Sequence, residues 1–303
     1  MHRLSRRTFL KTASASAAAA ALWNGSLPLM AYPLGLPLGL QLYSVRSMLP
    51  NDYAGTLQQL GALGYREVEA AGFFNHSLSE VKAAMDRAGL HCVSAHNSLA
   101  DLMAKTDEII QYGKSLGLQY IVCSSPRLKD PSRVPHADFH ATGKSMTLDD
   151  WRWNADQFNR IGKSVSEAGM RFAYHNHTPE FRSENGILFY DELLRLTDPL
   201  HVTMELDCGW AVVAGQNPAE IISRYPTRIS MLHVKDFKMT PAVTPDTPPT
   251  STELGRGTID YHPIFAAARK AHIEHMFVEQ EEFDVPAMEA LRIDADYMHA
   301  FTG

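Results

Sequence analysis

The sequence predicts a single α/β domain folded as a (β/α)8 TIM barrel, and three observations lead to this fold class. Short apolar runs alternate with helical segments along the chain, which is the period of a parallel sheet. Eight such units follow one another within 303 residues, a length that one barrel commonly occupies. Several apolar runs close in ionisable residues, as expected where the carboxyl ends of barrel strands build a site.

The expected strands are apolar runs, and several expected helices stop at a glycine. Strands are predicted at 36–45, 67–70, 91–96, 120–124, 170–177, 201–207, 229–236 and 275–280. Helices are predicted at 53–63, 79–88, 101–116, 147–168, 190–196, 218–224, 259–271 and 287–301. Thr147 and Asp150 approximate a capping box at the start of the longest helix. The stretches 126–147 and 238–257 are expected to be irregular loops.

Four of the later strands end in pairs of polar residues. Residues i and i+2 of a strand point to the same side, so each pair is expected on one face. The pairs are His175 and His177, Glu205 and Asp207, His233 and Lys235, and Glu279 and Glu281. Burying one such pair is costly, and four converging pairs are explained by a charge or a polar ligand between them.

One residue from each pair predicts a metal site. His175, Asp207, His233 and Glu279 offer two imidazoles and two carboxylates at equivalent strand ends. This donor set, without a thiolate, suits one divalent ion such as Mn2+, Co2+, Mg2+ or Zn2+ with positions open for water or substrate. For His233 taken alone, the favoured interpretation is a buried side chain whose hydrogen bonds are made within the protein. The four residues together favour a metal site.

The first 31 residues resemble a twin-arginine export signal. Arg6 and Arg7 lie in a Ser-Arg-Arg-x-Phe-Leu-Lys setting, and an Ala-rich apolar segment follows. The alternative is a basic, disordered start followed by an Ala-rich helix. The export interpretation divides the chain into a signal at 1–31 and a barrel at 36–303, and it implies a periplasmic protein of a bacterium.

Composition narrows the class of partner. The formal net charge of −6 disfavours a nucleic-acid partner, which requires a basic face. No stretch after the signal is long and apolar enough to span a bilayer. Cys92, Cys123 and Cys208 are too few and too scattered for a disulfide framework. Cys92 and Cys123 are expected in the core, and Cys208 either in the core or at the pocket.

The chain resembles the sugar phosphate isomerase/epimerase branch of the xylose-isomerase-like TIM barrels, also called the AP-endonuclease-2-like family. The resemblance rests on Tyr174-His-Asn-His177 with Glu180-Phe181, Glu205-Leu-Asp207, Leu232-His-Val-Lys-Asp236, Gly255-Arg-Gly257 and Val278-Glu-Gln280. In this family the metal is held by Glu or His, Asp, His and Glu on the fifth to eighth strands. The resemblance assigns those roles to His175, Asp207, His233 and Glu279.

The resemblance also implies a reaction. In this family the metal chelates a ketone oxygen and an adjacent hydroxyl and stabilises the enediolate formed when a neighbouring proton is removed. The catalytic candidates are Glu279 as base, His175, and Lys235, which stabilises charge or protonates a leaving group. The candidate substrate contacts are His96, Glu69, His177, Glu180 and Tyr43. For His96, Glu69 and Glu180 the alternative is a polar group at the surface or one that supports the site from behind.

Alternatives to an isomerase or epimerase stay open. His175 stands where family epimerases have Glu, which weakens a two-base epimerisation and favours an elimination. A 3-keto-glycoside lyase acting on unphosphorylated glycosides is the second hypothesis, and a non-catalytic exported carbohydrate-binding barrel is the third. A DNA-repair endonuclease is disfavoured, because Trp210 stands where that enzyme has a ligand His.

The expected partner is a small sugar or keto-sugar, and the sequence leaves a homo-oligomer open. The Pro-rich loop at 238–253 is either a lid, a contact to a second subunit, or neither. Gly255-Arg256-Gly257 resembles a phosphate loop weakly, and a turn that brings the backbone near the site is the favoured interpretation.

Overall fold

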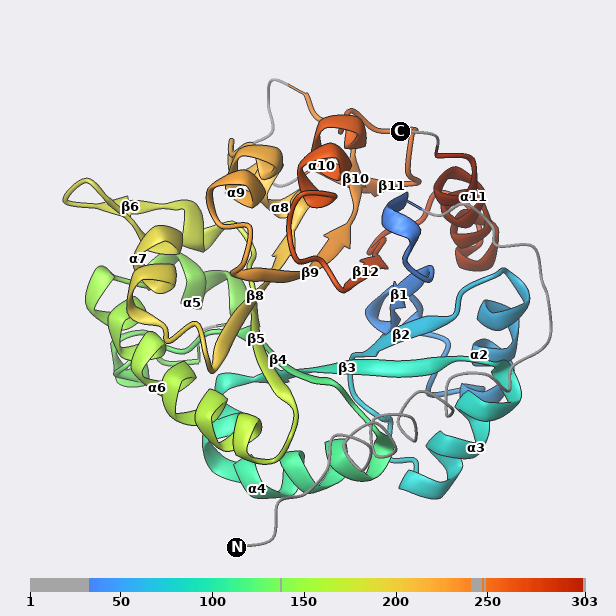
Figure 1. Ribbon diagram of the computed structural model, residues 1–303, viewed down its shortest axis with the longest axis horizontal. Coiled ribbons are helices and arrows are strands. Elements are labelled where there is room, and N and C mark those ends of the chain that lie inside the picture. The colour runs from blue at the N-terminus through green and yellow to red at the C-terminus, as the bar shows by residue number, and fades with distance from the viewer. Residues whose placement is uncertain (1–32, 137, 241–246, 248, 302–303) are drawn as a thin grey trace, which may run out of the picture. The chain divides into compact units, whose positions relative to one another are not determined.

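A computed structural model describes residues 33–136, 138–240, 247 and 249–301, and it confirms the predicted closed barrel (Figure 1). Parallel strands pair in the order β1-β12-β9-β8-β5-β4-β3-β2. They are β1 (Gly39–Gln41), β2 (Glu67–Ala70), β3 (His91–Ser98), β4 (Tyr120–Ser125), β5 (Arg171–His175), β8 (Val202–Asp207), β9 (Ile229–Val234) and β12 (His275–Val278). The expected signal at 1–31 lies outside the described residues.

Helices surround this barrel, as the view along its axis shows (Figure 1). They are α2 (Tyr53–Ala62), α3 (Leu78–Ala88), α4 (Leu99–Leu116), α6 (Leu148–Glu167), α7 (Phe189–Leu196), α9 (Pro218–Arg224), α10 (Tyr261–Ala268) and α11 (Ala287–Ala300). The predicted capping box of α6 is present: the Thr147 hydroxyl accepts from the Asp150 N–H, and Asp150 accepts from the Thr147 N–H. Gly89 and Gly117 end α3 and α4 in the left-handed conformation.

Local hydrogen bonds explain where the structure departs from the predicted boundaries. The first strand ends at Gln41, because the Gln41 side chain accepts from the Tyr43 N–H and starts a 3-10 helix over Leu42–Val45. Asp138 caps a short helix, α5 (Phe139–Ser145), inside the stretch expected to be irregular. Asp207 caps a further helix, α8 (Cys208–Val213), directly after its strand.

The inside of the barrel is layered along its axis. An apolar layer fills the middle: Val93, Tyr120, Val122, Ala173, Met231 and Phe277. On its amino-terminal side Glu67 and His275 form a buried hydrogen-bonded pair at 2.8 Å. On its carboxyl side the strand register aligns His175 with Glu205 and Asp207 with His233. The polar strand ends therefore meet above a closed apolar floor.

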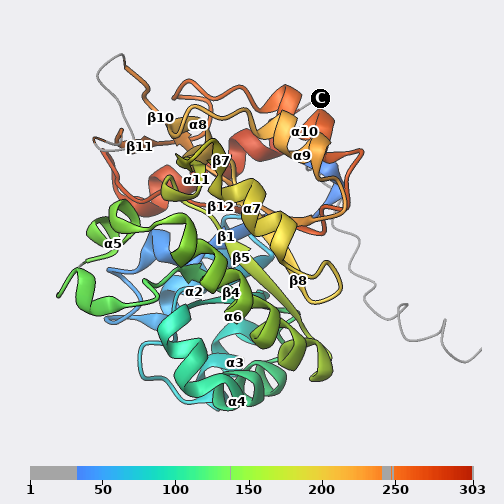
Figure 2. The ribbon, with the colours of Figure 1, turned by 90° about the vertical axis from the view of Figure 1, so that its left-hand side faces the viewer.

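The long connection after β9 is anchored near the site by Asp236. This residue begins β10 (Asp236–Phe237), which pairs with β11 (Ser251–Thr252). In the turned view α5 and the β10–β11 hairpin lie on one side of the barrel (Figure 2). The Asp236 carboxylate accepts backbone N–H groups of Gly255, Gly257, Thr258 and Ile259 at 3.0–3.1 Å. A Cβ at Gly257 would lie 2.1 Å from Asp236 Oδ1, so glycine is required there.

The Gly255-Arg256-Gly257 turn therefore already holds an anion, the chain's own carboxylate. The N–H groups of Gly255 and Gly257 donate to Asp236 and are not open to a phosphate. The structure therefore supports a turn near the site rather than a phosphate loop. Cys208, like Cys92 and Cys123, is buried in the apolar core.

Asp294 beneath this connection should make stability depend on pH. It is 1% exposed, accepts from the Leu254 N–H at 2.7 Å, and burial raises its pKa to about 7 from 3.8. A raised folded-state pKa gives stability that is complete below the unfolded value and lost as pH rises through 7. We expect Asp294→Asn to melt a few degrees above wild type at about pH 8.5 and by about half that margin at about pH 5.5, which lies midway between the two pKa values. A melting difference between the two proteins that does not grow from pH 5.5 to pH 8.5 would contradict the raised pKa of Asp294.

Candidate metal centre and substrate cavity

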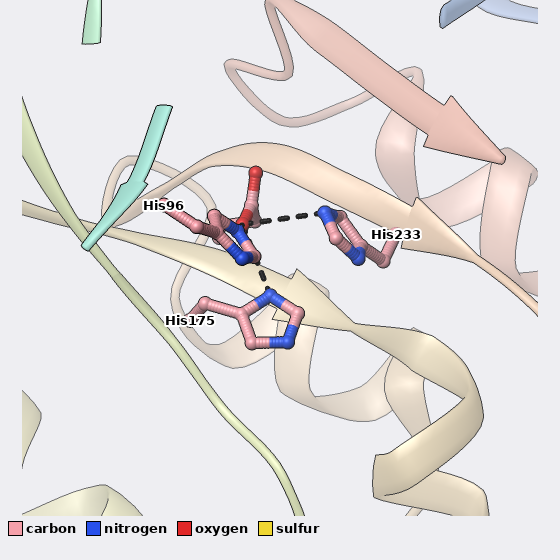
Figure 3. Close-up of side chains that lie close together, drawn as sticks. His96, His175 and His233 are labelled. Atoms are coloured by element: carbon pink, nitrogen blue, oxygen red, sulfur yellow. Dashed lines mark hydrogen bonds and ion pairs between the residues drawn. The ribbon is translucent and has the colours of Figure 1, made fainter. Parts of the chain in front are cut away.

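Glu205 lies at the centre of the polar cluster. Its Oε2 atom is 2.9 Å from His96 Nε2, 3.0 Å from His175 Nδ1 and 3.3 Å from His233 Nε2. Figure 3 shows these three imidazoles turned toward one another. Burial and Glu69 raise the pKa of Glu205, but the imidazoles outweigh both and bring it to about 2. Glu205 is thus an ionised carboxylate that fixes the orientation of three rings.

Glu69, on β2, contacts two of these three rings. Its Oε1 atom is 2.8 Å from His96 Nε2 and 2.8 Å from His233 Nε2, and it accepts from Gln41 at 2.7 Å. Burial lowers the pKa of His96, but Glu69 and Glu205 outweigh it and raise the pKa to about 9. His96 is therefore a charged imidazolium, and its Nε2 lies between the Glu69 and Glu205 carboxylates.

The opposite edges of His175 and His233 face Asp207 and Glu279. His233 Nδ1 is 3.0 Å from Glu279 Oε2 and 3.8 Å from Asp207 Oδ2, and His175 Nε2 is 3.9 Å from the same Asp207 oxygen. Asp207, His233 and Glu279 present ligand atoms within 4.8 Å of one another. The four residues predicted as ligands therefore come together, each imidazole with one nitrogen on Glu205 and the other on this group.

The donor group fits a divalent cation. Asp207 Oδ1 accepts from the Trp210 N–H at 2.7 Å, whereas the buried Asp207 Oδ2 accepts no hydrogen bond in the described structure and lies 3.3 Å from the Lys235 ammonium. Burial raises the pKa of Asp207, so a neighbouring cation would stabilise its ionised form. Burial and the His233 charge lower the pKa of His175 far below its usual value, which leaves a neutral imidazole able to bind a metal. This cluster could hold a metal ion.

A second set of metal-competent atoms lies on the Glu205 side. It consists of His96, His175, Glu205 and His233. Because Glu205 Oε2 already contacts all three imidazoles, we interpret this side as the support that orients the metal-facing nitrogens.

Lys235 is the ammonium group of the site. It is fully buried, and its Nζ lies 2.6 Å from Glu281, 2.9 Å from Glu279 and 3.3 Å from Asp207. Burial lowers its pKa, but the three carboxylates outweigh burial and raise it well above the usual value. The Trp210 ring lies 4.9 Å beneath the ammonium. Lys235 is therefore charged and held beside the donor group.

The charges of the cluster are unbalanced among the described residues. Five carboxylates, those of Glu69, Glu205, Asp207, Glu279 and Glu281, face three cations, His96, His233 and Lys235. The His233 pKa is raised well above its usual value, because the carboxylates at both ring nitrogens outweigh burial, so a metal bound by His233 would displace one proton from the ring. The excess negative charge favours a further cation at the donor group.

A cavity of about 410 Å3 opens above this cluster. Its walls are Tyr43, His96, Ser124, Ser125, Phe139, His140, His175, His177, Thr178, Trp210, Glu279 and Glu281. The His177 ring packs 4.6 Å from Phe139 and 6.3 Å from Trp210, and burial with the Lys235 charge lowers its pKa to about 3. Neutral His177 is therefore a hydrogen-bonding group on the cavity wall.

Of the five predicted substrate contacts, three line the cavity and two are buried behind it. Tyr43, His96 and His177 line the cavity. Glu69 and Glu180 are buried behind it. Glu180 accepts from the Tyr174 hydroxyl and, at 3.1 Å, from the His177 N–H, and burial raises its pKa to about 7. Glu180 thus holds the turn that carries His177.

Sequence reasoning missed three features. It placed Glu205 on the correct face but gave it no role, because the alignment of Glu205 with His175 appears only in the strand register. It left Phe139 and His140 in an irregular loop, although Asp138 three residues before Ala141 is a helix-capping signal. It used Trp210 only to argue against an endonuclease.

Comparison with known proteins identifies the family. A family model described as the xylose isomerase-like TIM barrel matches residues 57–300. The chain belongs to this family. A model of the twin-arginine translocation signal matches residues 3–23, so the amino-terminal segment is a twin-arginine export signal.

Relatives within the xylose isomerase-like family are enzymes. An inosose dehydratase of Geobacillus kaustophilus (strain HTA426) is 27% identical over 231 residues, which cover 69% of this chain and 73% of that protein. A sugar phosphate isomerase/epimerase structure from Parabacteroides distasonis ATCC 8503 has a TM-score of 0.71 at 23% identity, covering 86% of this chain and 97% of that one. A 3-keto-D-glucoside 4-epimerase structure from E. coli has a TM-score of 0.62 at 16% identity, covering 88% and 100%.

Both structural likenesses establish the barrel fold. Across the helices that the structure describes, none is long and apolar enough to cross a membrane.

Proposed function

We propose that this protein is a divalent-metal-dependent enzyme that removes a proton next to the carbonyl of a sugar, in the manner of a sugar isomerase or epimerase. The observation that carries the proposal is the convergence of Asp207, His233 and Glu279, with Glu279 and the neighbouring His175 lining the cavity. These four residues would hold a divalent ion, which would supply Lewis acidity next to the substrate carbonyl.

The chain's own residues supply the proton chemistry. Lys235 and His233 lower the pKa of Glu279 despite burial, so its carboxylate is ionised at neutral pH, the form a base requires. Lys235 Nζ, 2.9 Å from Glu279, is the proton donor or the stabiliser of developing charge. Neutral His175 binds the metal, and His96, His177 and Tyr43 contact the sugar hydroxyls from the cavity wall.

A specific observation favours elimination as the second candidate function. On the fifth strand of the barrel the donor is His175, a neutral imidazole engaged with Glu205, rather than a free carboxylate that would serve as a second base. Lys235, whose ammonium lies 2.9 Å from the proposed base Glu279, is the proposed proton donor to a leaving group. A 3-keto-glycoside lyase uses one base and one acid in this way, and the dehydratase among the relatives also bears the name of an elimination.

We further propose that the signal carries the protein through the twin-arginine route to the periplasm and is cleaved between Ala21 and Ala31. A periplasmic enzyme encounters unphosphorylated sugars and glycosides. The Asp236 carboxylate also accepts the N–H groups of the Gly255-Arg256-Gly257 turn, so this turn does not offer them to a substrate phosphate. Small neutral keto-sugars are therefore the proposed substrate class.

Incubation of the metal-loaded mature protein with ketoses and 3-keto-glucosides in D2O, followed by NMR, tests the reaction. We expect deuterium to enter next to the carbonyl. An altered sugar then identifies the isomerase or epimerase, and a released aglycone identifies the lyase. Metal binding without exchange into any of these sugars would reject both and leave the carbohydrate-binding barrel.

Lys235→Met should separate proton removal from expulsion of the leaving group. We expect the variant to release aglycone about 10²- to 10⁴-fold more slowly, because the acid is lost. Deuterium exchange into the same 3-keto-glucoside, which requires Glu279, should fall less. Lys238→Met, which removes an exposed lysine paired with Asp284, is the matched control. Equal loss of exchange and release in Lys235→Met would contradict an acid role for Lys235.

A further inference from the structure

A second cavity adjoins the first and shares Ser125 with it. It measures about 250 Å3, and its walls include Ser98, Arg127, Leu128, Val134 and Thr142. Helix α5 contributes Phe139 to the first cavity and Thr142 to the second. The two cavities therefore lie side by side along the end of β4, with α5 in the wall of both.

The segment that carries Arg127 is fixed from beneath by α6. The Arg127 N–H donates to Asn154 Oδ1 at 3.1 Å, and the Arg127 carbonyl accepts from Asn154 Nδ2 at 2.7 Å. The Lys129 N–H donates to Asp150 Oδ1 at 3.0 Å. Asn154 and Asp150 are buried. The wall of the second cavity is thus preorganised rather than a loose loop.

The polar groups on this wall have free hydrogen-bonding capacity. Within the described ranges, the Arg127 guanidinium makes no ion pair or hydrogen bond, although Arg133 nearby pairs with Asp150 at 2.8 Å. The Ser125 and Thr142 hydroxyls likewise make no side-chain hydrogen bond within those ranges. A half-buried guanidinium between two hydroxyls provides donors for a ligand that carries several acceptor oxygens.

Most of the remaining wall is apolar, and Ser98 and His136 are its other polar residues. Pro126, Leu128, Pro131 and Val134 line the cavity beside these donors. A sugar ring combines hydroxyl oxygens on its edge with C–H groups on its faces, and it matches such a wall. A plain aryl or alkyl group would leave the guanidinium and hydroxyls without acceptors, which costs affinity.

We propose that the second cavity, here called the Arg127 cavity, is a subsite for a second sugar unit of the substrate, with Arg127, Ser125 and Thr142 binding its hydroxyls. This inference rests on the proposed function and deepens it: the substrate is a disaccharide-type glycoside whose keto-sugar lies over the metal centre and whose second ring lies across Ser125. Arg127 sets this specificity without taking part in proton transfer.

Calorimetric titration of the metal-loaded mature protein with non-keto probes tests the subsite without requiring turnover. The probes are cellobiose, methyl β-glucoside, phenyl β-glucoside and glucose 1-phosphate. We expect cellobiose to bind about 10-fold more tightly than methyl β-glucoside, the effect of a charge-assisted hydrogen bond. Arg127→Met should abolish that advantage. Lys129→Met, which removes a neighbouring charge exposed on the same segment, should retain it.

Thr142→Val provides a second variant if Arg127→Met fails to fold, and it should reduce the cellobiose advantage by a smaller factor. Equal binding of cellobiose and methyl β-glucoside, or an advantage that survives both substitutions, would overturn the subsite. Preferential binding of the phenyl glucoside or the sugar phosphate would overturn it in favour of those ligands. A cellobiose advantage lost in Arg127→Met, together with no deuterium exchange into any keto-sugar, would keep the subsite and reject the proposed reaction.

Discussion

Replacing Glu279 by glutamine is expected to slow deuterium exchange next to the substrate carbonyl by about 10³-fold or more. Glutamine has the shape of glutamate but cannot accept a proton. Glu279 Oε2 lies 3.0 Å from His233 Nδ1 and 2.9 Å from Lys235 Nζ, so the substitution removes both the proposed base and one metal ligand. NMR detection of exchange at saturating metal measures the effect, and excess metal should not restore activity.

Glu282→Gln is the matched control for that experiment. Glu282 follows the same strand, and its carboxylate accepts from the Ser251 N–H at 3.0 Å, a bond that glutamine can also accept. Its side chain does not line the cavity. Exchange at the wild-type rate in Glu279→Gln would reject Glu279 as base, whereas an equal loss in Glu282→Gln would point to damage of the fold.

The fold was predictable because each barrel strand and most helices carry local signals. Thr147 and Asp150 form the capping box that their spacing predicts, and Gly89 and Gly117 end helices in the left-handed conformation. The misplaced boundaries depend on side chains that bond back to the main chain. Gln41 ends the first strand and Asp207 starts a helix in this way, and apolar periodicity does not report such bonds.

The site was predictable in part for a related reason. Alternation places His175, Asp207, His233 and Glu279 at strand ends, and the barrel brings those ends together. Which nitrogen of each imidazole faces which carboxylate depends on strand register and barrel closure. The Arg127 cavity depends on the packing of 127–129 against α6, far along the chain from the metal centre. No spacing in the sequence predicts either arrangement.

Glu205→Gln is expected to lower metal affinity by about 10- to 100-fold. The Glu205 carboxylate contacts Nδ1 of His175 at 3.0 Å and Nε2 of His233 at 3.3 Å, and so turns their other nitrogens toward Asp207 and Glu279. All three imidazoles contact the same oxygen, Oε2, and a glutamine oxygen in its place carries no negative charge, so it holds the rings less strongly. Titration of the metal-free variant with Mn2+ or Zn2+ measures the loss.

Glu67→Gln provides a control of the same residue type and burial. Glu67 also pairs with an imidazole inside the barrel, His275 at 2.8 Å, but on the opposite side of the apolar layer. We expect its metal affinity to match wild type. Because Glu205 positions ligands rather than reacting, excess metal should restore exchange in Glu205→Gln, unlike in Glu279→Gln. Failure of excess metal to restore exchange, or unchanged metal affinity in Glu205→Gln, would mean that the ion binds elsewhere or that Glu205 itself takes part in the chemistry.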